Sequence, residues 1–341
     1  MQMSNYILTG VAGFIGSHAT ESLLNNSDNR VFGIDSLSYS GNSTNLPTNR
    51  RNFTFFKGDI SEFSEMETAF SEAQNYFENA SFNVINFAAE SHVDRSIQSG
   101  IPFVKSNVLG VQVLLEVSAK YNCRRFVQIS TDEVYGSLES EFANEDFAIR
   151  PSSAYAASKA SADLLSLAYF RTHGLPVIIT RSTNNFGTRQ LSEKLIPRLM
   201  YLAAKNMDLP IYGSGANIRE WIPVTENVKR ILDVEKHGTP GTVYNIGSNF
   251  YLSNLEIAGM ILENFPTTSR IKKIEDRLGH DFRYAVDCTK GASLFGWNEP
   301  KNVTLLLLDT MNQYWSHYKT LTLEEERGIG SIEDFYSTNP Q

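Results

Sequence analysis

The chain has 341 residues, with 30 Lys and Arg against 38 Asp and Glu, a formal net charge of −8. This acidic balance argues against nucleic acid or an anionic membrane as the main partner, so an anionic ligand needs a local cationic pocket. The two cysteines, Cys123 and Cys288, exclude a disulfide framework and favour a cytoplasmic protein. With no basic leader and no run of about 18 apolar residues, we expect neither a signal peptide nor a membrane span.

Short apolar runs alternate with longer amphipathic stretches through the first half of the chain. In chain order, the expected strands cover residues 6–9, 30–34, 53–57, 84–87, 126–130 and 177–181, and the expected helices cover 16–25, 64–77, 104–121 and 155–173. This alternation predicts an α/β fold with a doubly wound parallel (Rossmann) sheet. After about Asn185, prolines and glycines break the pattern into short pieces, which predicts a smaller mixed α/β C-terminal substrate domain. Residues 323–341 are polar and are expected to form a loosely packed tail.

The first expected strand leads into a glycine turn that is typical of dinucleotide binding. Gly10 permits the tight turn, Gly13 lets the backbone approach a pyrophosphate, and Gly16 lets the helix pack closely on the sheet. The spacing is G-x-x-G-x-x-G, and three glycines alone also fit a purely structural turn. Asp35, 19 residues after Gly16, favours a ligand, because a carboxylate there binds ribose hydroxyls and repels a 2′-phosphate. We therefore expect NAD rather than NADP.

Asp59–Ile60 follows the third expected strand, where residues can contact the edge of an adenine ring. A helix N-cap role for Asp59 fits the same position equally well. The clusters of Cys and His residues that bind metals are missing from the sequence, so no metal is expected.

A second group of residues has the chemistry of alcohol oxidation. Tyr155 and Lys159 are four apart on an expected helix, so they share one face. A nearby ammonium and a nicotinamide cation both favour the phenolate, which makes Tyr155 able to accept a hydroxyl proton. Thr131 is expected to hydrogen-bond the same substrate hydroxyl. The alternative for Tyr155 and Lys159 is an ordinary pair on the helix surface.

Asp132 and Glu133 follow Thr131 directly and are not needed for an oxidation alone. If the strand continued through them, their side chains would point to opposite faces of the sheet. They can converge only if the chain turns at the carboxyl end of the strand, where ligands bind in open α/β sheets. The alternative is that Asp132 caps a turn while Glu133 is solvated.

These residues lie within longer motifs, and together the motifs resemble the nucleotide-sugar 4,6-dehydratases of the extended short-chain dehydrogenase/reductase family. The resemblance covers nearly the whole chain, and the Thr-Asp-Glu triplet is its most specific part. Its motifs are Thr-Gly-x-x-Gly-Phe-Ile-Gly at 9–16, Phe-Ala-Ala-Glu-Ser-His-Val-Asp-Arg-Ser-Ile at 87–97, Ser-Thr-Asp-Glu-Val-Tyr-Gly at 130–136, Tyr-x-x-Ser-Lys at 155–159, Asn-Asn at 184–185, Glu-Lys-Leu-Ile-Pro at 193–197, Ile-Arg-x-Trp at 218–221 and Gly-His-Asp-x-Arg-Tyr at 279–284.

The resemblance implies a three-step cycle on a nucleotide-diphospho-glucose. Tyr155 takes the C4 hydroxyl proton while the C4 hydride passes to NAD. Glu133 then removes the acidified C5 proton while Asp132 protonates the departing C6 hydroxyl. The hydride returns to C6 and a proton returns to C5, which gives a 4-keto-6-deoxy sugar nucleotide and regenerates NAD. The catalytic residues implied are Thr131, Asp132, Glu133, Tyr155 and Lys159.

The resemblance also implies two sets of binding residues. The expected NAD contacts are Gly10, Gly13, Phe14, Ile15, Gly16, Asp35, Ser36, Leu37, Ser38, Asp59, Ile60, Phe87, Ala88, Ala89, Ser106, Tyr155, Lys159 and Asn185. The expected nucleotide-sugar contacts are Ser91, Thr131, Asn184, Lys194, Leu195, Arg219, Asn254 and His280. Arg219 suits a diphosphate because a guanidinium forks onto phosphate oxygens, although a solvated arginine is the alternative. His280 fits a structural histidine equally well.

The chain departs from the family pattern at residues 181–190 and 222–227, which we expect beside the sugar-nucleotide pocket. Phe186 replaces a usual tyrosine, and Thr188 replaces a turn proline. Because these changes spare the catalytic triplet, the reaction type stands, while dTDP-glucose and UDP-glucose both stay open as substrates. A single methyl group is worth only about 1–3 kcal/mol of discrimination in a pocket.

We expect residues 1–185 to form the NAD-binding domain, with the chain returning to it around 220–245, and residues 186–341 to be mostly substrate-binding. The family resemblance implies a homodimer joined by the helices at 104–121 and 155–169. Their expected apolar stripes contain Leu109, Val113, Val117, Leu164, Leu165 and Ala168, residue types that also suit a plain core. Two other functions remain open, namely a UDP-sugar epimerase or decarboxylase of the same fold and a non-catalytic NAD-binding sensor.

Overall fold

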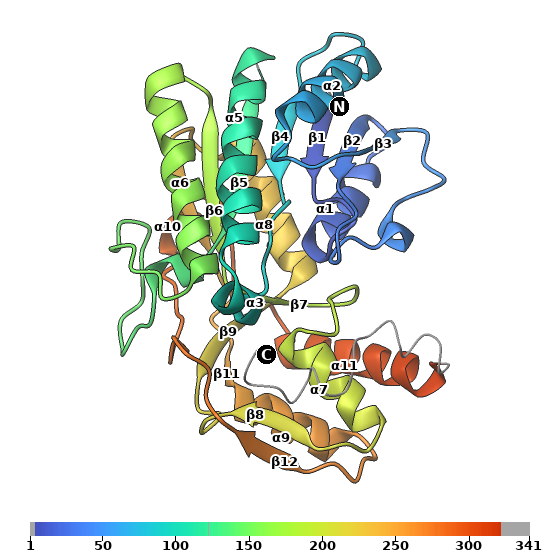
Figure 1. Cartoon of the computed structure of the whole chain (residues 1–341), viewed down its shortest axis with the longest axis vertical. Helices are drawn as coiled ribbons and strands as arrows, with labels where there is room; N and C mark the ends of the chain where they lie inside the picture. Colours follow the sequence, from blue (N-terminus) through green and yellow to red (C-terminus); the bar gives the residue numbers. More distant parts are fainter. Residues whose placement is uncertain (1–3, 122, 322–341) are drawn as a thin grey trace.

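A seven-stranded parallel sheet forms the larger part of the molecule (Figure 1). The structure, a computed structural model, describes residues 4–121 and 123–321, so the expected tail at 323–341 lies outside them. The strand order is β10-β6-β5-β4-β1-β2-β3, and all neighbouring strands are parallel. Their bounds are β1 (Ser4–Thr9), β2 (Asn29–Asp35), β3 (Phe53–Lys57), β4 (Asn83–Asn86), β5 (Arg125–Thr131), β6 (Val177–Ser182) and β10 (Thr242–Ile246).

Helices cover both faces of this sheet, because alternate residues of each strand point to opposite sides. In β1, Ile7 packs on one face with α2 (Phe63–Tyr76), α5 (Gly110–Lys120) and α6 (Ala154–His173). Leu8 packs on the other face with α1 (Phe14–Leu24), α8 (Val224–His237) and α10 (Thr289–Phe295). The predicted doubly wound α/β fold is therefore confirmed.

The remaining elements form a smaller lobe below the carboxyl ends of the strands (Figure 1). It has a three-stranded sheet in the order β11-β9-β7 and a parallel pair, β8 and β12. Leu199, Trp221, Ile257 and Leu307 lie in a separate apolar core that belongs to this lobe. Its elements are β7 (Asn184–Phe186), α7 (Leu195–Ala204), β8 (Leu209–Tyr212), β9 (Ile218–Pro223), β11 (Tyr251–Ser253), α9 (Asn254–Asn264), β12 (Ile271–Ile274) and α11 (Val303–Thr320).

The chain crosses between the sheet and the lobe more than once. It leaves the large sheet after β6, forms β7 to β9, and returns through α8 to β10 at the edge of that sheet. The predicted return around 220–245 corresponds to these two elements. The strand β10 itself was missed, although Pro240 and Gly241 precede this short run and Gly247 follows it.

The segment expected as one helix at 104–121 is a composite. It begins with α4 (Ile101–Phe103), continues through a π-helical stretch, Val104–Leu109, and ends with α5. The span Ile101–Lys120 has the length and composition of a membrane helix, yet its α5 part packs into the sheet core. Val113 and Val117, two residues of the expected dimer stripe, are buried in that core, whereas Leu109 and Leu164 are exposed.

The helix α6 carries Tyr155 and Lys159, and its ends are fixed by local capping. The Ser153 hydroxyl accepts a hydrogen bond from the Ala156 amide at 3.1 Å, which satisfies a free donor in the first turn. Gly174 ends the helix in the left-handed conformation, with φ of 67°. The caps thus fix both ends of α6, which packs against β5.

Candidate active site

In the glycine turn between β1 and α1, neighbouring backbone atoms leave no space for a side chain at Gly10 or Gly16. A Cβ on Gly10 would lie 2.7 Å from the Ala88 amide nitrogen, and a Cβ on Gly16 would lie 2.1 Å from the Gly10 carbonyl oxygen. Gly13 is the N-cap of α1, and the first turn has no acidic residue. The free amides of this turn border a cavity of about 350 Å³ and favour an anion there.

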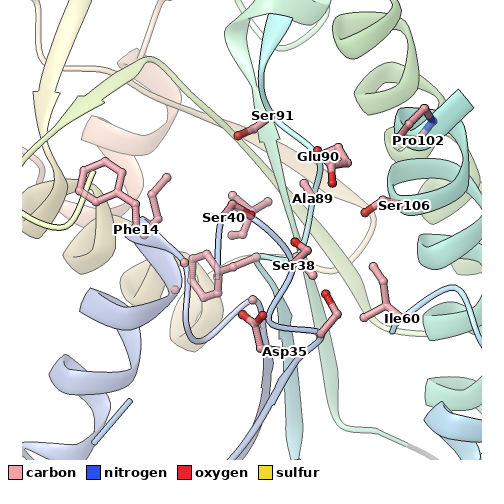
Figure 2. Close-up of a pocket in the computed structure, with 18 of the residues that line it drawn as sticks. Phe14, Asp35, Ser38, Ser40, Ile60, Ala89, Glu90, Ser91, Pro102 and Ser106 are labelled. Atoms are coloured by element: carbon pink, nitrogen blue, oxygen red, sulfur yellow. The ribbon is translucent and has the colours of Figure 1, made fainter. Parts of the chain in front are cut away.

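Asp35, at the end of β2, also borders this cavity, next to the glycine turn (Figure 2). Its Oδ2 accepts the Ala12 amide at 2.9 Å, and its Oδ1 accepts the Leu37 amide at 2.8 Å. Burial raises the pKa of this carboxyl, while the two amides act in the opposite direction. A glycine cradle, a helix N-terminus and this carboxylate together fit an adenine dinucleotide.

Most of the expected NAD contacts line this cavity. Those that do are Gly10, Gly13, Phe14, Ile15, Gly16, Asp35, Ser36, Ser38, Asp59, Ile60, Phe87, Ala88, Ala89, Ser106, Tyr155 and Lys159. Leu37 and Asn185 do not line it. Leu37 holds Asp35 through its backbone, and the Asn185 side chain donates to the Thr183 carbonyl at 2.9 Å. Sequence analysis missed Lys105 and Glu90, which also border the cavity.

The helix N-cap alternative for Asp59 is wrong, because Glu62 is the N-cap of α2. Asp59 borders the cavity, and its Oδ1 accepts the Ser61 amide at 2.9 Å in the turn before α2. The Lys105 ammonium, from the π-helical stretch, lies 3.3 Å from the other carboxylate oxygen. No sequence signal links Lys105 to Asp59, since the pair is 46 residues apart.

The chain turns at the end of β5, as convergence of the two carboxylates requires. A short 3₁₀ helix, Asp132–Tyr135, follows the strand, and the Thr131 hydroxyl accepts the Glu133 amide at 3.3 Å as its cap. The alternative in which Asp132 caps the turn and Glu133 is solvated is therefore wrong. Asp132 is 2% exposed, and its Oδ1 accepts the Thr131 hydroxyl at 3.2 Å. Glu133 borders a second cavity.

Electrostatics separate the two adjacent carboxyls. Burial, with the charges of Glu133 and Glu220, raises the pKa of Asp132 well above its usual value. Burial also raises the pKa of Glu133, but nearby cations, Arg277 first, act to lower it. The pKa of Asp132 is therefore raised more strongly than that of Glu133, which favours Asp132 as the acid and Glu133 as the base. Such divergent environments assign acid and base roles.

Tyr155 and Lys159 both lie on the cavity side of α6, with different electrostatics from those expected. Burial and the charge of Glu133 raise the pKa of Tyr155, while the Thr131 hydroxyl acts to lower it. Burial lowers the pKa of Lys159 to about 8, and its Nζ donates to the Ile129 carbonyl at 2.5 Å. Burial is thus the main cause of the raised pKa of Tyr155 among these side chains, and it opposes the effect expected of a nearby ammonium.

The second cavity, of about 180 Å³, lies between the large sheet and the lobe. Seven of the eight expected sugar-nucleotide contacts border it, namely Ser91, Asn184, Lys194, Leu195, Arg219, Asn254 and His280. The eighth, Thr131, is buried at the end of β5. Ser91 and Lys194 border both cavities, so the two form one continuous site.

Cationic side chains from separate segments converge on this cavity. Arg219 donates to the Asp281 carbonyl at 2.8 Å and stacks on the Tyr284 ring, 4.3 Å from its centroid, so it is not a solvated arginine. His280 lies 2.6 Å from Asp276, and burial lowers the pKa of this histidine. Sequence analysis missed Arg277 and Arg198, although Arg277 precedes the Gly-His-Asp motif by two residues.

The departures from the family pattern lie mostly behind the cavities and not beside them. Arg181 is 3% exposed and pairs with Asp163 at 2.9 Å, and it also donates to the Tyr135 hydroxyl. Phe186 packs in the core of the lobe. Within the described chain, the run at 222–227 contributes no residue to either cavity lining, whereas Gln190 borders the first cavity. The expected position beside the pocket is therefore wrong for most of these residues.

Comparison with known proteins agrees with this site. The family model described as GDP-mannose 4,6 dehydratase matches residues 7–310. A low-salt glycan biosynthesis protein, Agl12, from Haloferax volcanii is 46% identical, over 86% of this chain and 93% of that protein. A dTDP-glucose 4,6-dehydratase from Streptomyces griseus is 42% identical, over 92% of this chain and 95% of that enzyme.

Among solved structures, DesIV, a dTDP-glucose 4,6-dehydratase from Streptomyces venezuelae with NAD and TYD bound, superimposes with a TM-score of 0.85. It is 37% identical, and the match covers 92% of this chain and 97% of that one. The family resemblance inferred from the sequence motifs is thus confirmed. This chain belongs to the GDP-mannose 4,6-dehydratase family, the nucleotide-sugar 4,6-dehydratases of the extended short-chain dehydrogenase/reductases.

Proposed function

We propose that the protein is an NAD-dependent dTDP-glucose 4,6-dehydratase, which converts its substrate to the 4-keto-6-deoxy sugar nucleotide. One observation carries the proposal. Tyr155 and Lys159 border a cavity that fits a dinucleotide, and Glu133 borders a cationic cavity that fits a nucleotide diphosphate and shares Ser91 and Lys194 with the first. The choice of dTDP-glucose draws on relatives that carry this name at 42% identity and below.

The residue roles follow from burial and charge. Tyr155 accepts the C4 hydroxyl proton, with Thr131 as hydrogen-bond partner of that hydroxyl and Lys159 as the cation that favours the phenolate. The chemistry that NAD supplies when bound is hydride acceptance from C4 and hydride return to C6. Glu133 removes the C5 proton, and Asp132, whose pKa is raised more strongly than that of Glu133, protonates the departing C6 hydroxyl.

Binding divides between the two cavities. The α1 N-terminus and Asp35 hold NAD, through its pyrophosphate and its adenine ribose. Arg219 and Lys194 hold the diphosphate of the substrate, since buried cations recover their lost hydration by pairing with phosphate oxygens. The chain as a whole is acidic, with a formal net charge of −8, so this cationic pocket differs in charge from the rest of the protein.

Loss of one water molecule from the sugar nucleotide tests the proposal. We expect pure protein to dehydrate dTDP-glucose faster than UDP-glucose, with mass spectrometry as the readout. The variant Tyr155→Phe, which lacks the proton-accepting oxygen, is the negative control. Mass loss from neither substrate would overturn the dehydratase assignment, and an unchanged mass with inverted C4 would indicate an epimerase. Water loss from UDP-glucose alone would replace the nucleotide assignment.

A homodimer in the cytoplasm completes the proposal. Large apolar side chains are exposed along the composite helix and α6, at Ile101, Val104, Leu109 and Leu164. A contiguous exposed apolar patch marks an interaction surface, and a symmetric pairing of these helices would cover it. Free cysteines are consistent with a reducing compartment. We expect Leu164→Asp to produce monomers in sedimentation, and a wild-type monomer would contradict the dimer.

A further inference from the structure

Arg277, Arg219 and Lys194 border the second cavity and act to lower the pKa of Glu133. Two of these cations are held by backbone carbonyls. Arg219 donates to the carbonyls of Ile218 and Asp281, each at 2.8 Å. Lys194 donates to the Ser91 carbonyl at 2.7 Å. Backbone acceptors cannot be lost by exchange of a side chain, so these two positions are built into the fold.

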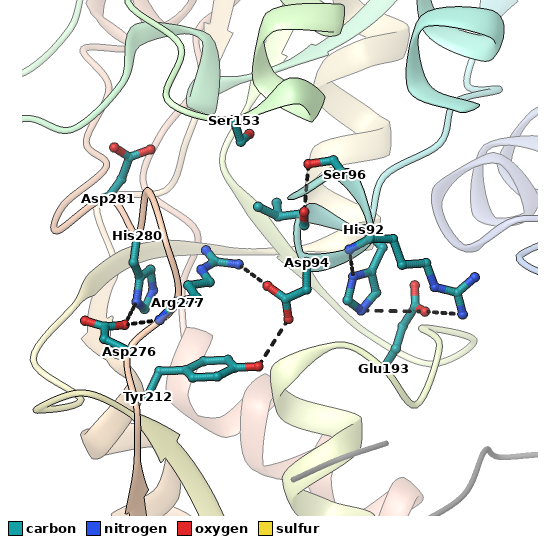
Figure 3. A network of polar contacts seen from close by, with 12 residues as sticks. His92, Asp94, Ser96, Ser153, Glu193, Tyr212, Asp276, Arg277, His280 and Asp281 are labelled. Carbon is teal, nitrogen blue, oxygen red and sulfur yellow. Dashed lines mark hydrogen bonds and ion pairs between the residues drawn. The ribbon is translucent and has the colours of Figure 1, made fainter. Parts of the chain in front are cut away.

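Arg277, the third cation, is held differently (Figure 3). Its Nη1 donates to Asp94 Oδ1 at 2.9 Å, while its buried Nε has no hydrogen-bond partner among the described residues. Arg277 lies in a segment without helix or strand, between β12 and the Gly-His-Asp motif. Asp94 lies in the first turn of α3 (Val93–Gln98) and also accepts the Tyr212 hydroxyl at 3.3 Å. The position of Arg277 therefore depends on one side chain from the opposite wall.

We propose that Asp94 is a positioning residue for removal of the C5 proton, because its carboxylate holds the Arg277 guanidinium in the cavity that Glu133 borders. The inference rests on the proposed 4,6-dehydratase function and deepens it. A guanidinium in that cavity stabilises the ionised form of a nearby carboxylate, which is the form a base requires. Asp94 acts on Glu133 through Arg277 and does not itself face the reacting carbon.

The charged groups around Glu133 support an effect of Asp94 that acts through Arg277. Burial raises the pKa of Glu133, and Arg277 is the strongest of the cations that oppose the shift, ahead of Arg219 and Lys194. The titratable and charged groups that face Glu133 from the packed elements are Asp132, Tyr155, Lys194, Arg219, Arg277, Asp281 and Tyr284. Displacement of Arg277 therefore removes the largest favourable charge.

The variant Asp94→Ala should shift the pKa of Glu133 in opposite directions, depending on whether Asp94 acts by its own charge or by positioning Arg277. If Asp94 acted only by its own charge, its removal would lower the pKa of Glu133 and extend activity to lower pH. If it positions Arg277, its removal raises that pKa, and the acid limb of the kcat profile moves to higher pH. The direction of the shift therefore identifies the role without any assumption about its size.

The experiment compares full-length wild type, Asp94→Ala, Arg277→Ala and the double variant with dTDP-glucose between about pH 5 and pH 9. The readouts are kcat for water loss and solvent deuterium uptake at C5. We expect the acid limb of Asp94→Ala to move up by about one unit, a tenfold loss of kcat on that limb. The double variant should lose no more than Arg277→Ala, because both changes remove one interaction. Asp94→Asn, which keeps an acceptor, should restore part of the loss.

Glu21→Ala is the matched control, since it removes the carboxylate partner of Arg189, 2.8 Å away, outside both cavities. It should leave the acid limb in place. An unchanged or lowered limb in Asp94→Ala, or additive losses in the double variant, would overturn the inference alone. If Asp94→Ala does not fold, the same comparison of Asp94→Asn with Arg277→Ala decides the question. A wild-type protein that releases no water would overturn the proposed function, and this inference with it.

Discussion

The buried ion pair between Arg181 and Asp163 gives a stability prediction whose size follows from the structure. Arg181 Nε lies 2.9 Å from Asp163 Oδ2, and the two side chains are 3% and 0% exposed. Asp163→Ala leaves the guanidinium buried without its counter-charge, which costs about 3–5 kcal/mol. With a urea slope of about 3 kcal/mol/M, the unfolding midpoint should fall by about 1 M or more. Equilibrium urea unfolding followed by circular dichroism measures this change.

Two further variants separate the effect of burial from the effect of pairing. Asp163→Leu combined with Arg181→Met removes both charges and should lose less free energy than Asp163→Ala. Glu78→Ala breaks a pair of equal length, 2.9 Å to Arg30, but Glu78 is 75% exposed. It should cost less than about 1 kcal/mol. Equal losses in the single and double charge variants would refute the reasoning, because the cost would then come from packing alone.

Three other predictions concern the site. Gly16→Ala places a Cβ 2.1 Å from the Gly10 carbonyl oxygen, so the turn must open and NAD affinity should fall about a hundredfold in calorimetry; unchanged affinity would contradict the cradle. Glu133→Gln should stop deuterium uptake at C5 while sparing NAD binding, and wild-type exchange would exclude Glu133 as the base. Because burial lowers the pKa of Lys159 to about 8, its charge disappears as the pH rises through that value. The kcat for water loss should therefore fall above about pH 8, as the cation that favours the phenolate of Tyr155 is lost, and a flat profile to pH 10 would refute this role.

Much of the large sheet could be predicted because its signals are local. The strand at Phe53–Lys57 has the expected bounds, since an apolar run between turn residues defines it without help from distant contacts. Convergence of the Asp132 and Glu133 carboxylates required a turn at the end of the strand, but the sequence pattern does not show that the chain turns there. The cause of the turn is a single contact, the Thr131 hydroxyl with the Glu133 amide.

The parts that could not be predicted depend on contacts between distant segments. Asp94 and Arg277 are 183 residues apart, and the sequence around each gives no sign that they form an ion pair. Tyr155 and Lys159 have the right helical spacing, yet spacing does not reveal that Ile129 offers a carbonyl to the ammonium or that burial dominates the phenol. Family motifs supplied the sugar-nucleotide contacts, because position in a motif carries information that residue type alone lacks.

The origin of β10 has a consequence for anyone who wishes to exchange sugar specificity between such enzymes. The edge strand of the large sheet comes from chain that follows β7 to β9 of the lobe. A fragment that ends at residue 185 would lack β10 and α8 and would expose the open side of β6 to aggregation. The lobe is thus not a detachable module. A working chimera needs at least three splice junctions, after β6, before α8 and after β10, because pocket residues such as Asn254 and Arg277 follow β10.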